Sequence, residues 1–140
     1  MIGILDSKTI IITGGSVGIG SVIANKCASE GAEVIIVARN KKDLDSSLNN
    51  LKTISDKNHR SYSLDVKDLN AIKAFANWLE NEGLIINGLV NCAGVYGPIG
   101  KTIDVDMDKF TETIKINFLG TVYMCNMIAP LMKNNGHNKI

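Results

Sequence analysis

Glycine and small polar residues cluster near the N-terminus, where they follow a β-branched apolar run and precede a segment with helical apolar spacing. The cluster reads Thr13-Gly14-Gly15-Ser16-Val17-Gly18-Ile19-Gly20. Glycines at a helix N-terminus leave backbone N–H groups open, and a phosphate can approach them closely because they carry no Cβ. The cluster therefore predicts a dinucleotide-binding turn. The alternative is a tight turn whose glycines only pack a strand against a helix.

Arg39 and Asn40 follow the apolar run 33–38, which predicts a second buried strand. Folds of this kind place an acidic side chain at the tip of that strand, against the ribose 2′-hydroxyl of NAD. A guanidinium instead forms charge-assisted bonds to a 2′-phosphate. The pair therefore predicts NADP as the cofactor, with NAD still possible. The alternative is a solvated surface arginine at the start of a helix.

Two further polar sites stand where predicted strands end. Asp65-Val66 follows the short strand 61–64, and Asn91-Cys92-Ala93-Gly94 follows a strand within 84–90. Open parallel sheets bind ligands at the carboxyl ends of their strands, so Asp65 could accept the adenine amino group and the small residues 92–94 could leave room for a flat ring. The alternatives are a turn-forming aspartate at a helix entry and a simple turn after a core strand.

The segments between these sites alternate strand and helix patterns, which predicts parallel strands joined by right-handed crossovers. Ile19, Val22, Ile23 and Cys27 share one face of the first predicted helix. Asn40 can cap a second helix with the buried stripe Leu44, Leu48 and Leu51. Asp68 can cap a third helix, which ends at Gly83 and buries Ile72, Phe75, Ala76 and Leu79.

A last helix is predicted over about 106–133, and its apolar residues form two stripes. One stripe is Met107, Phe110, Ile114, Phe118, Cys125 and Met132, and the other is Ile116, Leu119, Tyr123, Met127 and Leu131. A helix that is apolar on two faces needs two partners, namely the sheet and either a later helix or another subunit. This helix therefore predicts a homo-oligomer. Asn117 stands among apolar neighbours in this helix, where a buried amide needs a hydrogen-bonding partner. Residues 134–138 predict a turn, and 139–140 predict the start of a fifth strand.

Composition narrows the class of protein. With 140 residues, 45% of them apolar, the chain predicts one domain over 1–140. A net charge of +1 with scattered lysines predicts neither nucleic-acid nor membrane binding. Cys27, Cys92 and Cys125 are widely spaced, which favours reduced thiols in the cytoplasm over disulfides or a metal site. Asp6 and Lys8 interrupt any signal peptide, and the uncharged run 116–132 is too short to span a membrane.

Taken together, four motifs resemble the short-chain dehydrogenase/reductase family, in its smaller single-domain branch. They are residues 13–20, 65–66, 91–94 and 116–120. The resemblance implies that the glycine turn holds a pyrophosphate, that Asp65 lies beside the adenine and that residues 91–94 touch the nicotinamide ribose. It also implies that Asn117 is the active-site asparagine, whose backbone holds a water in a proton relay. The cofactor-binding residues we expect are Gly14, Ser16, Val17, Gly18, Ile19, Gly20, Arg39, Asn40, Asp65, Val66, Asn91, Ala93 and Gly94.

The chain departs from the family pattern at three places. Cys92 replaces the commoner asparagine, and the glycine turn lacks the basic residue often seen in members that prefer NADP. The family's serine and Tyr-x-x-x-Lys pair are also missing. No tyrosine here has a lysine four residues beyond it, since the residues four beyond Tyr62, Tyr96 and Tyr123 are Val66, Gly100 and Met127. The predicted fold is thus a Rossmann-type three-layer α/β fold with a parallel sheet of order 3-2-1-4, truncated before strand five.

The predicted function is the dinucleotide-binding half of an oxidoreductase that transfers hydride between NADP(H) and an alcohol or carbonyl, inactive on its own. A first alternative is a non-catalytic nucleotide-binding or regulatory module. A second alternative is a methyl-donor-binding transferase, although such a protein would favour an acidic residue where Arg39 stands.

Overall fold

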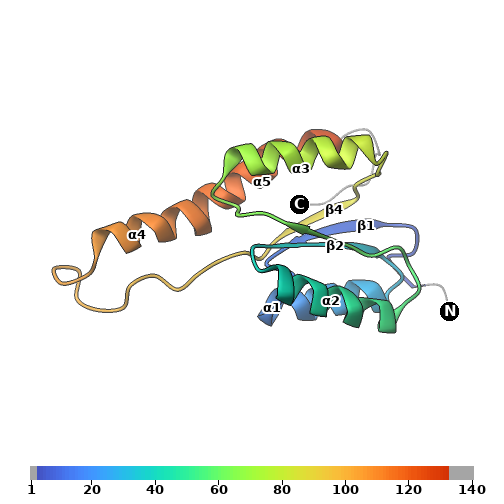
Figure 1. Cartoon of the computed structure of the whole chain (residues 1–140), viewed down its shortest axis with the longest axis horizontal. Coiled ribbons are helices and arrows are strands. Elements are labelled where there is room, and N and C mark those ends of the chain that lie inside the picture. The colour runs from blue at the N-terminus through green and yellow to red at the C-terminus, as the bar shows by residue number, and fades with distance from the viewer. Residues whose placement is uncertain (1–2, 133–140) are drawn as a thin grey trace.

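The computed structural model describes residues 3–132 and forms three layers around a parallel sheet (Figure 1). The sheet consists of β1 (Thr9–Thr13), β2 (Glu33–Ala38), β3 (Arg60–Ser63) and β4 (Gly88–Asn91). Its order is β3-β2-β1-β4, and each neighbouring pair is parallel, which confirms the predicted order. Strands buried on both faces have nearly continuous apolar sequences, as β1 and β2 do.

Helices cover the two faces of the sheet in pairs. Helices α1 (Gly18–Ser29) and α2 (Lys41–Ile54) cover one face, and α3 (Leu69–Asn81) and α5 (Gly120–Met132) cover the other (Figure 1). Alternate residues of each strand supply the two cores, because successive side chains point to opposite faces. Ile10 and Ile12 thus belong to the core under α1 and α2, whereas Ile11 belongs to the core under α3 and α5.

Helix α1 packs on the sheet through small residues. Its buried residues are Gly20, Ala24 and Ala28, whereas Ile19 and Val22 are exposed. The predicted apolar face was therefore wrong for Ile19 and Val22. Its other two members, Ile23 and Cys27, do pack against the core. The physical reason is that a helix can approach a sheet closely only where its side chains are small.

The predicted caps of α2 and α3 are confirmed. The Asn40 side chain accepts hydrogen bonds from the backbone N–H groups of Lys42 and Asp43, and Asp68 caps α3 in the same way. The predicted buried stripe of α3 is confirmed in full, and in α2 the half-buried Leu48 packs beside the buried Leu44 and Leu51. Gly83 ends the turn after α3 with φ of +64°.

Two strand boundaries differ from the prediction. The third strand is 60–63 rather than 61–64, although the Leu64 N–H still donates to the Ala38 carbonyl at 3.0 Å. The fourth begins at Gly88 rather than Leu84, because the Leu84 N–H turns back to donate to the Leu79 carbonyl at 3.1 Å. Just before β4, the Asn87 side chain accepts the Thr9 N–H at 2.9 Å.

The last helix is not one regular α-helix. It comprises α4 (Met107–Ile114), a π-helical turn η1 (Lys115–Leu119) and α5. The predicted stripes are confirmed only in part. The buried residues of η1 and α5 are Ile116, Gly120, Met124, Ile128 and Met132, and Tyr123, Cys125, Met127 and Leu131 pack against the same core. The members Met107, Phe110, Ile114 and Phe118 are exposed, so that part of the prediction was wrong. Helix α4 projects beyond the end of the sheet and buries none of its residues (Figure 1). Lys133 and the turn and strand predicted over 134–140 lie outside the described residues.

Candidate functional site

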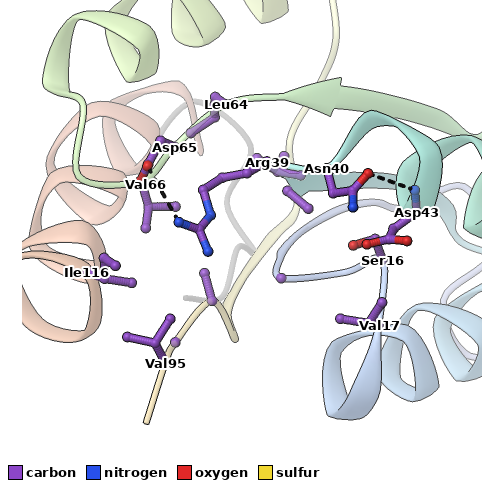
Figure 2. Close-up of a pocket in the computed structure, with 15 residues that line it drawn as sticks. Ser16, Val17, Arg39, Asn40, Asp43, Leu64, Asp65, Val66, Val95 and Ile116 are labelled. Carbon is purple, nitrogen blue, oxygen red and sulfur yellow. Dashed lines mark hydrogen bonds and ion pairs between the residues drawn. The ribbon is translucent and has the colours of Figure 1, made fainter. Parts of the chain in front are cut away.

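A pocket of about 200 Å³ opens at the carboxyl ends of the strands. The expected cofactor-binding residues that line it are Gly14, Ser16, Val17, Arg39, Asn40, Asp65, Val66, Ala93 and Gly94. Gly18, Ile19, Gly20, Asn91 and Asn117 do not line it. Figure 2 shows side chains that line this pocket, with Asp65, Val66 and Ile116 on one side and Ser16, Val17 and Asp43 on the other.

The glycine turn combines close packing with an open helix N-terminus. A Cβ on Gly20 would lie 2.1 Å from the Gly14 carbonyl oxygen, and one on Gly14 would lie 2.9 Å from the Ala93 Cα. These two glycines therefore do serve packing. Gly18 is different, because it has φ of +57° and a Cβ there would meet nothing within 4 Å.

The N-terminus of α1 is free to hold an anion. Val17 is its N-cap residue, and no side chain among residues 3–132 caps the helix. The first N–H groups of an α-helix have no partner within the helix, and the helix dipole adds positive potential there. The turn thus fits a phosphate-bearing group by both backbone geometry and electrostatics.

Thr13 joins the glycine turn to the segment after β4, a link that the sequence did not reveal. Its buried hydroxyl oxygen accepts hydrogen bonds from the backbone N–H groups of Cys92 and Ala93, both at 3.1 Å. Asn91, the last residue of β4, takes no part in this tie, because its amide donates to the Cys125 sulfur in α5 at 3.4 Å. The Asn91 Oδ1 is buried and has no hydrogen-bonding partner among the described residues.

Arg39 and Asp65 carry opposite charges at the ends of neighbouring strands. The Arg39 Nη1 atom lies 3.9 Å from the Asp65 Oδ2 atom. Asp65 also behaves as a turn former, because its Oδ1 accepts the Lys67 N–H at 3.1 Å. The Lys67 ammonium contacts Glu112 of α4, and this hydrogen bond raises the pKa of Lys67 and lowers that of Glu112.

Asn117 lies in the π turn and is exposed, so the prediction that it is buried was wrong. Its side chain is still satisfied, because it accepts the Val95 N–H and donates to the Val95 carbonyl, each at 2.9 Å. The Asn117 backbone oxygen accepts the Thr121 hydroxyl at 3.2 Å. Asn117 thus fixes the loop that carries Val95 into the pocket wall.

Several pocket residues were missed by the sequence prediction. They are Val37, Ala38, Asp43, Leu64, Val95 and Ile116. Asp43 was open to prediction, since it stands three residues after the cap Asn40 and so begins a helix at the strand tip. Ile116 was not open to prediction, because it lines the pocket from a π turn that the sequence did not indicate.

Three structural absences hold for residues 3–132. No three His, Cys, Asp or Glu side chains in this range gather closely enough to hold a metal ion. None of the helices there is long and apolar enough to cross a membrane. Cys27, Cys92 and Cys125, all within the same range, form no disulfides.

The fold and the pocket together define an α/β protein with a ligand site at the carboxyl edge of a parallel sheet. The family model for short chain dehydrogenases matches residues 8–140. The chain therefore belongs to the short-chain dehydrogenase family, which confirms the resemblance seen in its motifs.

Relatives and solved structures agree with this assignment. The chain is 36% identical to the uncharacterised oxidoreductase YxbG of Bacillus subtilis, over 96% of this chain and 49% of that protein. It is 31% identical to a 3-dehydrosphinganine reductase of Danio rerio, over 97% of this chain and 42% of that protein. The chain thus spans about half the length of the curated relatives it matches.

Solved short-chain dehydrogenases share the fold. One from Shigella flexneri, complexed with NADP, superposes with a TM-score of 0.93 at 21% identity, over 99% of this chain and 59% of that chain. A short-chain type dehydrogenase/reductase from Mycobacterium ulcerans gives a TM-score of 0.88 at 25% identity, over 96% of this chain and 50% of that chain.

Proposed function

We propose that the chain is the dinucleotide-binding half of an oxidoreductase that transfers hydride between NADP(H) and an alcohol or carbonyl substrate. The observation that carries this proposal is the uncapped N-terminus of α1, which opens beside a pocket walled by three other strand ends. Family membership supports the reaction class, and one relative is named as a reductase of a keto compound. The three unpaired thiols support a cytoplasmic setting.

Each part of the pocket is assigned a part of the dinucleotide. The glycine turn, from Gly14 to Gly20, would hold the pyrophosphate through backbone N–H groups. Asp65 and Val66 would border the adenine, and residues 91–94 would border the nicotinamide ribose. The nicotinamide supplies or accepts the hydride when the cofactor is bound.

The preference for NADP rests on Arg39 and Asn40. The Arg39 side chain is 60% exposed and lines the pocket, where a 2′-phosphate could form charge-assisted hydrogen bonds with its guanidinium. The N-terminus of α2, capped by Asn40, adds positive potential at the same place.

Hydride transfer also needs a proton donor for the substrate oxygen. A general acid contributes roughly 10²- to 10⁴-fold in rate. None of the three tyrosines has a lysine four residues beyond it, and an amide such as Asn117 is not a useful acid near neutral pH. We therefore propose that the 140 residues bind the cofactor but do not turn over a substrate alone.

The missing Tyr-x-x-x-Lys pair also favours a second candidate, a nucleotide-binding or regulatory module without chemistry of its own. The two candidates predict different coding sequences beyond residue 140 in the gene. A reading frame that continues into a serine strand and a Tyr-x-x-x-Lys helix supports the oxidoreductase, and an immediate stop supports the module.

Binding tests the cofactor assignment. NADPH and NADH are titrated into the chain while nicotinamide fluorescence is recorded, with S-adenosylmethionine as a third ligand. Tighter binding of S-adenosylmethionine would favour the methyl-donor alternative. Arg39→Asp is expected to narrow the NADPH preference by roughly tenfold or more, because a charge-assisted hydrogen bond contributes roughly 1.5 to 3 kcal/mol.

Lys52→Asp is the matched control, since it makes the same charge change at the far end of α2. An unchanged ratio of dissociation constants in Arg39→Asp would remove Arg39 from the assignment. In parallel, NADPH oxidation is assayed with a panel of ketones and aldehydes. Turnover above the uncatalysed rate would mean that the catalytic groups lie within these 140 residues.

A further inference from the structure

We infer that Asp65 is a positioning residue for Arg39: it holds the guanidinium over the pocket with one edge free for a 2′-phosphate. This inference rests on the proposed binding of NADP and adds a second residue to the recognition of its phosphate. It concerns a role of Asp65 that is separate from its proposed contact with the adenine.

The end of β3 holds Arg39 at both its backbone and its side chain. The Leu64 N–H donates to the Ala38 carbonyl at 3.0 Å, and the Ser63 hydroxyl donates to the Arg39 carbonyl at 3.1 Å. The Asp65 Oδ2 then lies 3.9 Å from the Arg39 Nη1. The arginine is thereby held at its backbone and at its guanidinium, although its side chain as a whole is 60% exposed.

Asp65 is itself fixed by its own turn. Its Oδ1 accepts the Lys67 N–H at 3.1 Å, and its Oδ2 lies 3.9 Å from the Lys67 ammonium as well as from Arg39. The direction of the carboxylate is thus set independently of Arg39. Asp65 is therefore held by contacts with Lys67, and the longer, more flexible Arg39 side chain pairs with it.

The ion pair leaves most of the guanidinium available. Arginine has five N–H donors in a planar fork, and the ion pair with Asp65 joins the carboxylate to Nη1 at 3.9 Å. The remaining edge can bind a phosphate with two parallel hydrogen bonds. Figure 2 shows Arg39 extended from the tip of β2 towards Asp65. An arginine already held in this place loses less conformational freedom when a phosphate binds.

Asp43 provides a matched control. It lines the same pocket from α2, on the side of Ser16, and no ion pair joins it to Arg39 within residues 3–132 (Figure 2). Removal of a carboxylate from the pocket should by simple electrostatics tighten the binding of the more negative ligand. Asp43→Asn should therefore leave the preference for the more negative ligand unchanged or raise it, whereas the positioning role predicts a lower preference in Asp65→Asn.

The experiment compares adenosine 2′,5′-bisphosphate with adenosine 5′-monophosphate by titration calorimetry on the 140-residue chain. The ratio of their dissociation constants reports the 2′-phosphate alone, because any loss at the adenine cancels. In Asp65→Asn we expect the preference for the bisphosphate to fall about two- to fivefold, the range of an exposed ion pair. In Asp43→Asn it should stay or rise. Asparagine keeps an oxygen that can accept the Lys67 N–H, so the turn is retained.

A double-mutant cycle separates positioning from a general structural effect. In an Arg39→Gln background, Asp65→Asn should leave the ratio unchanged, because no guanidinium remains to be held. If the single variant Asp65→Asn keeps or raises the preference for the bisphosphate over the monophosphate, the inference is overturned. A wild-type ratio of one also overturns it, yet leaves dinucleotide binding intact. Failure of the wild-type chain to bind NADPH, NADH and both adenosine nucleotides would instead overturn the proposed function.

Discussion

The side chain of Asn117 forms two hydrogen bonds with the backbone of a single residue, Val95, one to its N–H and one to its carbonyl, each at 2.9 Å. This pair fastens the loop after β4 to the π turn between α4 and α5. Both Val95 and Ile116, the neighbour of Asn117, line the pocket. The π turn therefore shapes the pocket wall through one amide side chain.

Replacement of Asn117 by alanine should loosen this wall. We expect a loss of about 1 kcal/mol in the free energy of unfolding, since exposed hydrogen bonds contribute at the low end of ~0.5 to 1.5 kcal/mol each. Nucleotide affinity should fall with it. Asn126→Ala is the control, because Asn126 is an exposed asparagine of the same helix and shares the gain in helix propensity. Urea denaturation measures the stability of both variants. Equal stabilities would contradict the proposed link between Asn117 and Val95.

Gly20 should tolerate a methyl group less well than Gly18. Gly20→Ala places a Cβ 2.1 Å from the Gly14 carbonyl oxygen and should cost roughly 1 to 3 kcal/mol or more, with loss of nucleotide binding. Gly18→Ala meets open space and should cost only the roughly 1 to 2 kcal/mol of a left-handed backbone. Thermal unfolding and NADPH titration of the two variants test this order, which would be refuted if Gly18→Ala were the more damaging change.

His59 should make the stability of the fold depend on pH. Its ring is buried, its Nδ1 accepts the Val34 N–H at 3.1 Å and its Nε2 lies 2.9 Å from the Ser55 hydroxyl. Burial, assisted by the charge of Lys52, lowers the pKa of His59 from its ordinary 6.5. Because the unfolded chain binds this proton more readily, the contribution of His59 is complete above pH 6.5 and is lost as the pH falls through the lower folded-state pKa.

Denaturation at several pH values between 7 and 5 checks this prediction. His59→Asn keeps an acceptor near the Val34 N–H but does not titrate, so its stability should change less over that range. Hydrogen bonds to lysines lower the pKa of Glu30 and of Glu112 from its ordinary 4.5. Their contribution to stability is lost mainly below about pH 5, because the loss begins near the unfolded-state pKa. A wild-type slope equal to that of the variant would rule out His59 as its source.

The isolated chain should self-associate through α4 and the π turn next to it. Met107, Phe110, Ile114 and Phe118 are all exposed there, and β4 pairs with β1 alone among the described strands. An apolar patch with a free strand edge favours association. Sedimentation at micromolar concentration should show dimers or larger species, fewer of them in Phe110→Glu than in the control Thr111→Glu. A monomeric wild-type chain would contradict this prediction.

The sequence by itself determined the elements and their order, because the forces that form them are local. β-branched apolar runs produced the buried strands β1 and β2, and Asn40 and Asp68 began the helices that they were predicted to cap. Alternation of strand and helix then left one common arrangement, the parallel sheet of order 3-2-1-4. The pocket followed from the same alternation, since parallel strands bring their carboxyl ends to one edge.

Only the tertiary structure decided how these elements meet. Thr13 bonds to Cys92 and Ala93 across 79 and 80 residues, and Arg39 reaches Asp65 from a neighbouring strand. In the last helix, α4 leaves Met107, Phe110 and Ile114 exposed. Close packing on the sheet buries Ala24 and Ala28 of α1 and leaves Ile19 exposed. Each of these outcomes depends on atoms brought together from distant parts of the chain, and the local spacing of residue types does not encode such distances.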